Sequence, residues 1–173
     1  MALRHRLLGK AARLYWRLTR PRTLGVRALV LDPDDRVALV RYTYGAHWYL
    51  PGGGVKKKEN FDAAIARELR EEIAIAEFAV ERILGVYHSM REFKDDHVVV
   101  FVVRVSDASA LARADLLEIE EAAWFPLDAL PEGTSPATLR RIDEYRAGAT
   151  GTGDWISPAP SPPPDAPCSA DKT

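Results

Sequence analysis

Three glutamates near the middle of the chain have the spacing of a metal site. Glu68, Glu71 and Glu72 fall in a stretch that predicts a helix. At about 100° per residue, a helix gathers their carboxylates within about a third of its circumference. Carboxylates three and four positions apart repel one another unless a cation neutralises them. Mg²⁺ favours oxygen ligands, and proteins often bind it through one or two carboxylates. The pattern therefore predicts a site for a hard divalent cation, and the alternative is an ordinary solvated acidic helix.

The residues around the glutamates predict how they are positioned. Asn60 is expected to cap the start of the helix through its side-chain oxygen. Three glycines at 52–54 precede it and let the backbone approach a ligand closely. An apolar stripe at a spacing of four marks the packing side, beside the carboxylates: Phe61, Ile65, Leu69 and Ile73. The sequence thus predicts a glycine-rich loop that leads into an amphipathic helix.

The stretch from Gly53 to Ile75 resembles the Nudix box, in which Gly, Glu, Arg-Glu, Glu-Glu and bulky aliphatic residues recur at fixed spacings. Eight of the nine fixed positions match. Ala74 stands where the family has Gly, and a left-handed Ala there costs about 1 kcal/mol. Lys56–Lys58 stand where many relatives have an acid and a Gly, and they are either solvated or attract a polyphosphate. The matching residues are Gly53, Glu59, Arg67, Glu68, Leu69, Glu71, Glu72 and Ile75.

The resemblance implies the fold and the site. The expected fold is α/β, a Nudix-type α/β/α sandwich with a mixed β-sheet. The expected cofactor is Mg²⁺, with Mn²⁺ as a substitute. Glu68 is the expected catalytic base with Glu71 as the alternate, and Arg67 is expected to orient Glu59 or a site carboxylate. The metal ligands implied are the Gly53 carbonyl, Glu68, Glu71, Glu72 and a late carboxylate, Glu118, with Glu120 and Glu121 as alternatives.

The function implied is a pyrophosphohydrolase that cleaves a phosphoanhydride bond of a nucleoside diphosphate linked to a second group. Its partner is then a nucleotide-type small molecule. Two other functions remain open. One is a catalytically silent Nudix-fold module with a nucleotide-binding or regulatory role. The other is an adaptor that contacts a membrane or RNA through the basic N-terminal segment.

Composition divides the chain into three parts. Residues 1–22 hold seven Arg or Lys and no acid, and they predict a basic amphipathic helix. This helix either covers a hydrophobic patch or an oligomer partner, such as the second subunit of a homodimer, or contacts an anionic membrane or nucleic acid. It lacks the apolar run of a signal peptide. Residues 23–147 are expected to form the Nudix domain, and the Pro-rich residues 148–173 a disordered tail.

Other features complete the expectation. The single cysteine, Cys168, cannot form an internal disulfide, which is compatible with a cytoplasmic location. Trp48 is expected to pack in the domain rather than stack on a nucleobase, and His47 is expected to be structural. Residues 90–96 are expected to form a polar hairpin loop. Strands are predicted at 24–31, 37–42, 80–88, 97–105 and 118–126, and further helices at 127–130 and 135–146.

Overall fold

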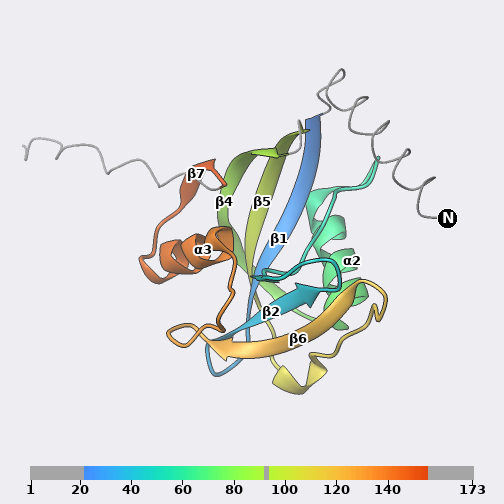
Figure 1. The fold of residues 1–173 in the computed structure, drawn as a ribbon, viewed down its shortest axis with the longest axis vertical. Coiled ribbons are helices and arrows are strands. Elements are labelled where there is room, and N and C mark those ends of the chain that lie inside the picture. The colour runs from blue at the N-terminus through green and yellow to red at the C-terminus, as the bar shows by residue number, and fades with distance from the viewer. Residues whose placement is uncertain (1–21, 92–93, 156–173) are drawn as a thin grey trace, which may run out of the picture.

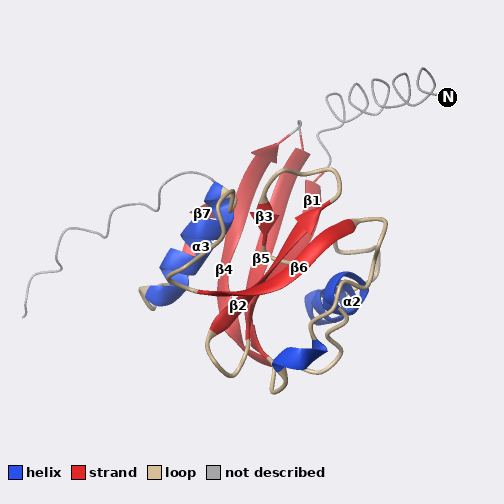
Figure 2. Cartoon of the chain, turned by 60° about the horizontal axis from the view of Figure 1, so that its bottom comes forward, coloured by secondary structure: helices blue, strands red, loops and turns tan. Residues whose placement is uncertain are grey.

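The computed structural model describes residues 22–91 and 94–155, which form a mixed sheet between two helices. Figure 1 shows α2 (Phe61–Ile73) and α3 (Pro136–Arg146) on opposite sides of the central strands, and Figure 2 shows the same layers from another direction. This confirms the predicted α/β/α sandwich. The strands are β1 (Arg22–Leu31), β2 (Arg36–Tyr42), β3 (Trp48–Tyr49), β4 (Ala79–Arg91), β5 (Lys94–Arg104), β6 (Ile119–Pro126) and β7 (Gly151–Asp154), and a 3₁₀ turn, η1, spans Ala108–Ala110.

The sheet has the order β3-β2-β1-β5-β4-β7, and β6 pairs with β2. β1 runs parallel to β5 over its whole length, whereas β4 and β5 form an antiparallel pair. Side chains of β1 alternate between two hydrophobic clusters, because successive residues of a strand point to opposite faces. Val26, Ala28 and Val30 pack with α2 on one face. Leu29 and Leu31 belong to the cluster on the α3 face. Burial on both faces explains the continuous apolar sequence of this strand.

Helix α2, which carries the residues of the Nudix box, is capped by Asn60 as predicted and ends at Ala74. The Asn60 side chain caps it by accepting a hydrogen bond from the backbone N–H of Ala63. Ala74 ends it in the left-handed conformation, with φ of 61°. Of the predicted apolar stripe, Ile65, Leu69 and Ile73 are buried, but Phe61 in the first turn is 36% exposed. No helix in the described part of the chain is long and apolar enough to cross a bilayer.

Two local predictions are wrong. Residues 127–130 form a turn rather than a helix. The Ala129 N–H donates a hydrogen bond to the Pro126 carbonyl, and Pro131, which has no backbone N–H, prevents a helix from continuing. The polar loop expected at 90–96 is mostly strand, since β4 continues to Arg91 and β5 begins at Lys94. The β4–β5 hydrogen-bonded pairing continues through these polar residues. The change from apolar to polar residues therefore shows where the hydrophobic core ends, whereas the sheet extends further.

The tail predicted from residue 148 is also corrected, since residues 151–154 form β7 parallel to β4. The composition predicted a disordered tail, but glycine at position 151 permits close packing of the two strands. A Cβ added at Gly85 would lie 2.1 Å from the Gly151 carbonyl, and one at Gly151 would lie 2.7 Å from the Tyr87 hydroxyl. Residues 156–173 and 1–21 lie outside the described residues, and Arg22 belongs to β1 rather than to the predicted N-terminal helix.

Candidate active site

The glycine loop that precedes α2 runs along β1. The Gly53 carbonyl accepts a hydrogen bond from the Val26 N–H, and the Pro51 carbonyl accepts one from Ala28, each at 2.9 Å. Gly52 has φ of 134°, and a Cβ at this position would lie 2.3 Å from the Val26 carbonyl oxygen. Only glycine fits there. The loop backbone is therefore fixed against the sheet before any ligand binds.

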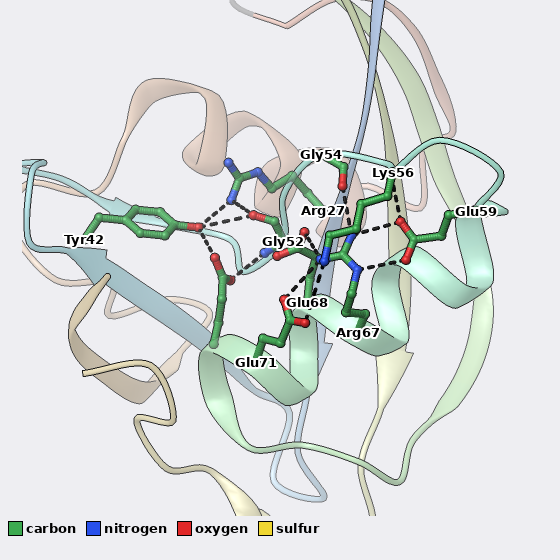
Figure 3. A network of polar contacts seen from close by, with 10 residues as sticks. Arg27, Tyr42, Gly52, Gly54, Lys56, Glu59, Arg67, Glu68 and Glu71 are labelled. Carbon is green, nitrogen blue, oxygen red and sulfur yellow. Dashed lines mark hydrogen bonds and ion pairs between the residues drawn. The ribbon is translucent and has the colours of Figure 1, made fainter. Parts of the chain in front are cut away.

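Arg67 organises the part of the site beside the glycine loop (Figure 3). Its Nε and Nη2 donate to the two carboxylate oxygens of Glu59 at 2.8 and 2.9 Å, which is the bidentate pair that the sequence predicted. Its Nη1 donates to Glu68 at 2.6 Å and to Glu71 at 3.2 Å. Hydrogen bonds from Arg67 and from the Lys56 backbone N–H lower the pKa of Glu59 to about 2. One guanidinium thus links three carboxylates.

Glu68 and Glu71 differ in their access to solvent. The Glu68 side chain is nearly buried against the loop, and a Cβ added at Gly53 would lie 2.5 Å from its Oε1. The Glu71 side chain is 53% exposed, and Lys56 Nζ lies 3.9 Å from its carboxylate. The first carboxylate is therefore held in place, whereas the second can move to meet a ligand.

Glu72 occupies a separate, buried network. Its two oxygens accept hydrogen bonds from the Tyr42 hydroxyl at 2.7 Å and from the Gly52 N–H at 2.8 Å. Burial raises the pKa of Glu72 to about 7, although nearby Arg27 opposes this shift and Glu68 adds to it. Arg27 Nη1 donates to the Tyr42 hydroxyl and to the carbonyls of Leu50 and Gly52. The sequence analysis missed Arg27 and Tyr42, although a single arginine within an apolar strand was a signal.

The late carboxylates fall into two groups. Glu118 accepts a hydrogen bond from the Tyr44 hydroxyl at 2.8 Å, and the Tyr44 ring stacks on that of Tyr42. Glu118 thus borders the Glu72 network. Glu120 and Glu121 instead form ion pairs with Arg41, on the strand that pairs with β6.

Two residues near the glycine loop prove to be structural neighbours of the site. Trp48 is buried and packs edge-on against Phe125, with ring centroids 5.0 Å apart, which confirms the predicted packing role. His47 Nδ1 lies 3.0 Å from the Gly133 carbonyl oxygen, so its polar contact is with a neighbouring loop.

The donor set fits a hard divalent cation. Carboxylates and a backbone carbonyl are oxygen donors of the kind that Mg²⁺ prefers. Glu72 receives one hydrogen bond on each oxygen, and the Gly53 carbonyl receives one from Val26. Since each such oxygen has two lone pairs, each retains capacity for an ion. Two cations, Arg67 and Lys56, face the three carboxylates of Glu59, Glu68 and Glu71, so the cluster has more negative than positive charge.

A cleft extends from the glycine loop across the α3 side of the sheet. It comprises two hollows of about 410 Å³ and about 190 Å³, which share Arg27, Asp96 and Val98. The larger hollow reaches Gly53 and Gly54, and the smaller one reaches Thr138 and Trp155. The cleft thus leads from the glycine loop towards α3 and β7.

The NUDIX domain model matches residues 21–145, so the chain belongs to the Nudix hydrolase family. This confirms the resemblance of the box. A putative 8-oxo-dGTP diphosphatase of Bacillus subtilis is 30% identical over 127 residues, which are 73% of this chain and 82% of that protein. A prenyl-diphosphate phosphatase of Methanosarcina mazei is 32% identical over 108 residues, 59% of this chain, and the chain spans only 62% of that protein's length.

Solved structures agree with this assignment. A MutT NUDIX hydrolase from Burkholderia pseudomallei superposes with a TM-score of 0.61 at 25% identity, covering 71% of this chain and 97% of that one. A MutT protein from Methanosarcina mazei superposes with a TM-score of 0.63 at 24% identity, covering 75% and 96% of the two chains, and supports the fold alone.

Proposed function

We propose that the protein is a divalent-cation-dependent pyrophosphohydrolase that cleaves the phosphoanhydride bond of a nucleoside diphosphate linked to a second group. The observation that carries this proposal is the set of carboxylates that Arg67 holds against the glycine loop. Relatives named as a diphosphatase and as an ADP-ribose pyrophosphatase support the reaction class. All the carboxylates of the box are present, which disfavours a catalytically silent module.

Mg²⁺ is the proposed cofactor, and Mn²⁺ should substitute for it. Glu68, Glu71, Glu72 and the Gly53 carbonyl would hold the ion, and Glu118 is the additional carboxylate proposed from the segment before β6. When bound, the ion supplies charge neutralisation for phosphate oxygens and acidifies a nearby water. This chemistry requires no redox-active side chain.

Glu68 is the proposed general base. Its carboxylate is fixed by Arg67 and by the loop backbone, and a base must lie within hydrogen-bond reach of the proton that it accepts. Arg67 acts as a positioning residue, because its own donors are occupied by carboxylates and the Gly54 carbonyl. Glu71, which is more exposed, is the alternate base.

The cleft between the glycine loop and α3 is the proposed place for the rest of the substrate. It starts beside Gly53 and Gly54, so a diphosphate at the carboxylates would have its organic group in the hollow beyond. Lys56–Lys58 lie in the loop before the N-terminus of α2, where positive charge attracts a polyphosphate.

The test is product release from a substrate panel with Mg²⁺, Mn²⁺ or EDTA. The panel contains ADP-ribose, nucleotide sugars, dinucleoside polyphosphates, normal and oxidised nucleoside triphosphates, prenyl diphosphates and 5′-triphosphorylated RNA. Glu71→Gln and Glu68→Gln should lose turnover, whereas Glu120→Gln, whose carboxylate pairs with Arg41, is the matched control. Cation binding without turnover of any substrate would favour the binding-module function.

A further inference from the structure

A second cluster of metal-ligating side chains lies at the end of the β4–β5 pair, away from the box. His88 and His97 are directly opposite each other on these antiparallel strands. Asp95 precedes His97 by two residues and therefore lies on the same face of β5. One donor atom from each of the three side chains lies within 4.8 Å of the others. We call these three residues the His/Asp cluster.

The distances within the His/Asp cluster suit a single ion. Asp95 Oδ1 lies 2.8 Å from His88 Nε2 and 3.9 Å from His97 Nδ1. Bonds of about 2 Å to a zinc ion place its ligand atoms roughly 3 to 4 Å apart. The His88 and His97 side chains are 37% and 43% exposed, so an ion can reach them from solvent. His88 Nε2 and Asp95 Oδ1 share a hydrogen bond, so an ion bound here would replace the shared proton and separate these two atoms slightly.

Neighbouring charged groups support the orientation of two of the three ligands. The second ring nitrogen of His88, Nδ1, lies 3.8 Å from the Asp154 carboxylate on β7. The second oxygen of Asp95 accepts from Arg22 Nε at 3.3 Å. Metal-binding histidines usually direct their other ring nitrogen at a carboxylate or carbonyl, which fixes the ring. A simple surface His–Asp pair explains neither the facing second imidazole nor this outer carboxylate.

The donor types select the class of ion. Imidazole nitrogen suits zinc and other first-row transition metals, whereas Mg²⁺ prefers oxygen alone. The geometry points to a second metal site, in which His88, His97 and Asp95 bind a zinc-class transition-metal ion independently of the box carboxylates. Such an ion joins β4 to β5, and the Asp154 carboxylate of β7 lies nearby.

The site would also stiffen the cleft. Ser89 follows His88 and Asp96 lies between the other two cluster residues, and both line the hollow on the opposite side of the sheet. Because adjacent residues of a strand point to opposite faces, an ion on one face fixes the backbone that carries cleft residues on the other. The ion thus has a structural role.

Zinc binding to the full-length, metal-free chain tests the proposal. Zn²⁺ is titrated against a chromogenic chelator with excess Mg²⁺ present to saturate the box carboxylates. Wild type should bind one equivalent, and His88→Asn and His97→Asn should each weaken binding by more than about 100-fold, since even outer-shell losses cost 10–100-fold. His47→Asn is the matched control, because this exposed histidine lies outside the cluster.

Three further measurements test whether the variants still fold and whether Zn²⁺ binds at the His/Asp cluster rather than at the box carboxylates. Thermal unfolding in EDTA should give similar midpoints for wild type and the histidine variants, whose side chains are partly exposed. Zn²⁺ should raise the midpoint of wild type and not that of the histidine variants. Asp154→Asn should weaken Zn²⁺ binding about 10-fold. Equal Zn²⁺ affinity in wild type and His97→Asn, or no binding of Zn²⁺ in excess Mg²⁺, would overturn the proposal.

Discussion

The box carboxylates and the His/Asp cluster are assembled in different ways. The residues of the first lie in one continuous stretch, in which helical periodicity and one arginine bring them together. Those of the second come from two strands, β4 and β5, and meet through strand register. The first offers oxygen donors to a hard cation and the second offers imidazoles to a softer one. Local spacing can thus reveal one kind of site, while the other requires the fold.

The largest expected effect separates the two sites by activity. Glu68→Gln removes the proposed base, and turnover should fall by about 10²–10⁴-fold, the usual contribution of a positioned base. Zn²⁺ affinity at the His/Asp cluster should not change. Steady-state kinetics and the zinc titration on the same preparation measure both. Retention of wild-type turnover would remove Glu68 from the mechanism.

The glycine loop offers a structural way to break only the box site. Gly52→Ala combines a φ of 134° with a Cβ 2.3 Å from the Val26 carbonyl oxygen. It should cost about 1–3 kcal/mol of stability, as residues in such backbone conformations do, and weaken Mg²⁺ binding. Gly54→Ala is the control, since a Cβ there meets nothing within 4 Å. Urea unfolding and Mg²⁺ titration measure both effects. Equal stability and equal Mg²⁺ affinity of the two variants would show that the loop backbone is not constrained at Gly52.

The buried glutamate gives the box site a pH dependence. The pKa of Glu72 in the folded chain, about 7, exceeds its ordinary value of 4.5, so the folded state binds this proton more tightly than the unfolded state. Its stabilising contribution is complete below pH 4.5 and is lost as the pH rises through about 7. At about 1.4 kcal/mol per pKa unit, this contribution to the free energy of unfolding is roughly 3 kcal/mol.

Glu72→Gln should remove this part of the pH dependence. Urea unfolding in EDTA at pH 5 and pH 8 should show a smaller loss of stability in the variant than in wild type. Because a cation requires the deprotonated carboxylate, Mg²⁺ affinity of wild type should also increase across this range. Parallel stability profiles for the two proteins would contradict the assigned environment of Glu72.

The smallest expected effect tests the one departure from the box. Ala74 is left-handed at the end of α2, where glycine carries no steric penalty. Ala74→Gly should therefore stabilise the protein by up to about 1 kcal/mol, without changing turnover. A thermal melt detects the shift, and Ala147→Gly, at a right-handed C-cap, is the comparison that should show no gain.

Much of the fold could be predicted because local signals agreed with it. Asn60, Ser135 and Pro136 mark helix starts, and both helices begin there. The apolar run at 24–31 predicted a strand, and β1 contains all of it. The wrong predictions fell where the same local sequence is compatible with two different structures. The composition from residue 148 onward suggested disorder, yet close contact with Gly85 and Tyr87 makes glycine at position 151 a requirement for pairing with β4.

The sequence by itself determined the box site in outline, because Glu68, Glu71 and Arg67 are neighbours on one helix whatever surrounds them. Tertiary structure alone decided that Glu72 is buried beneath Gly52, that Arg27 and Tyr42 surround it, and that Glu120 is taken by Arg41. It also decided that His88 faces His97. Helical periodicity is a local property of the chain, whereas burial and strand register depend on segments that are distant in sequence.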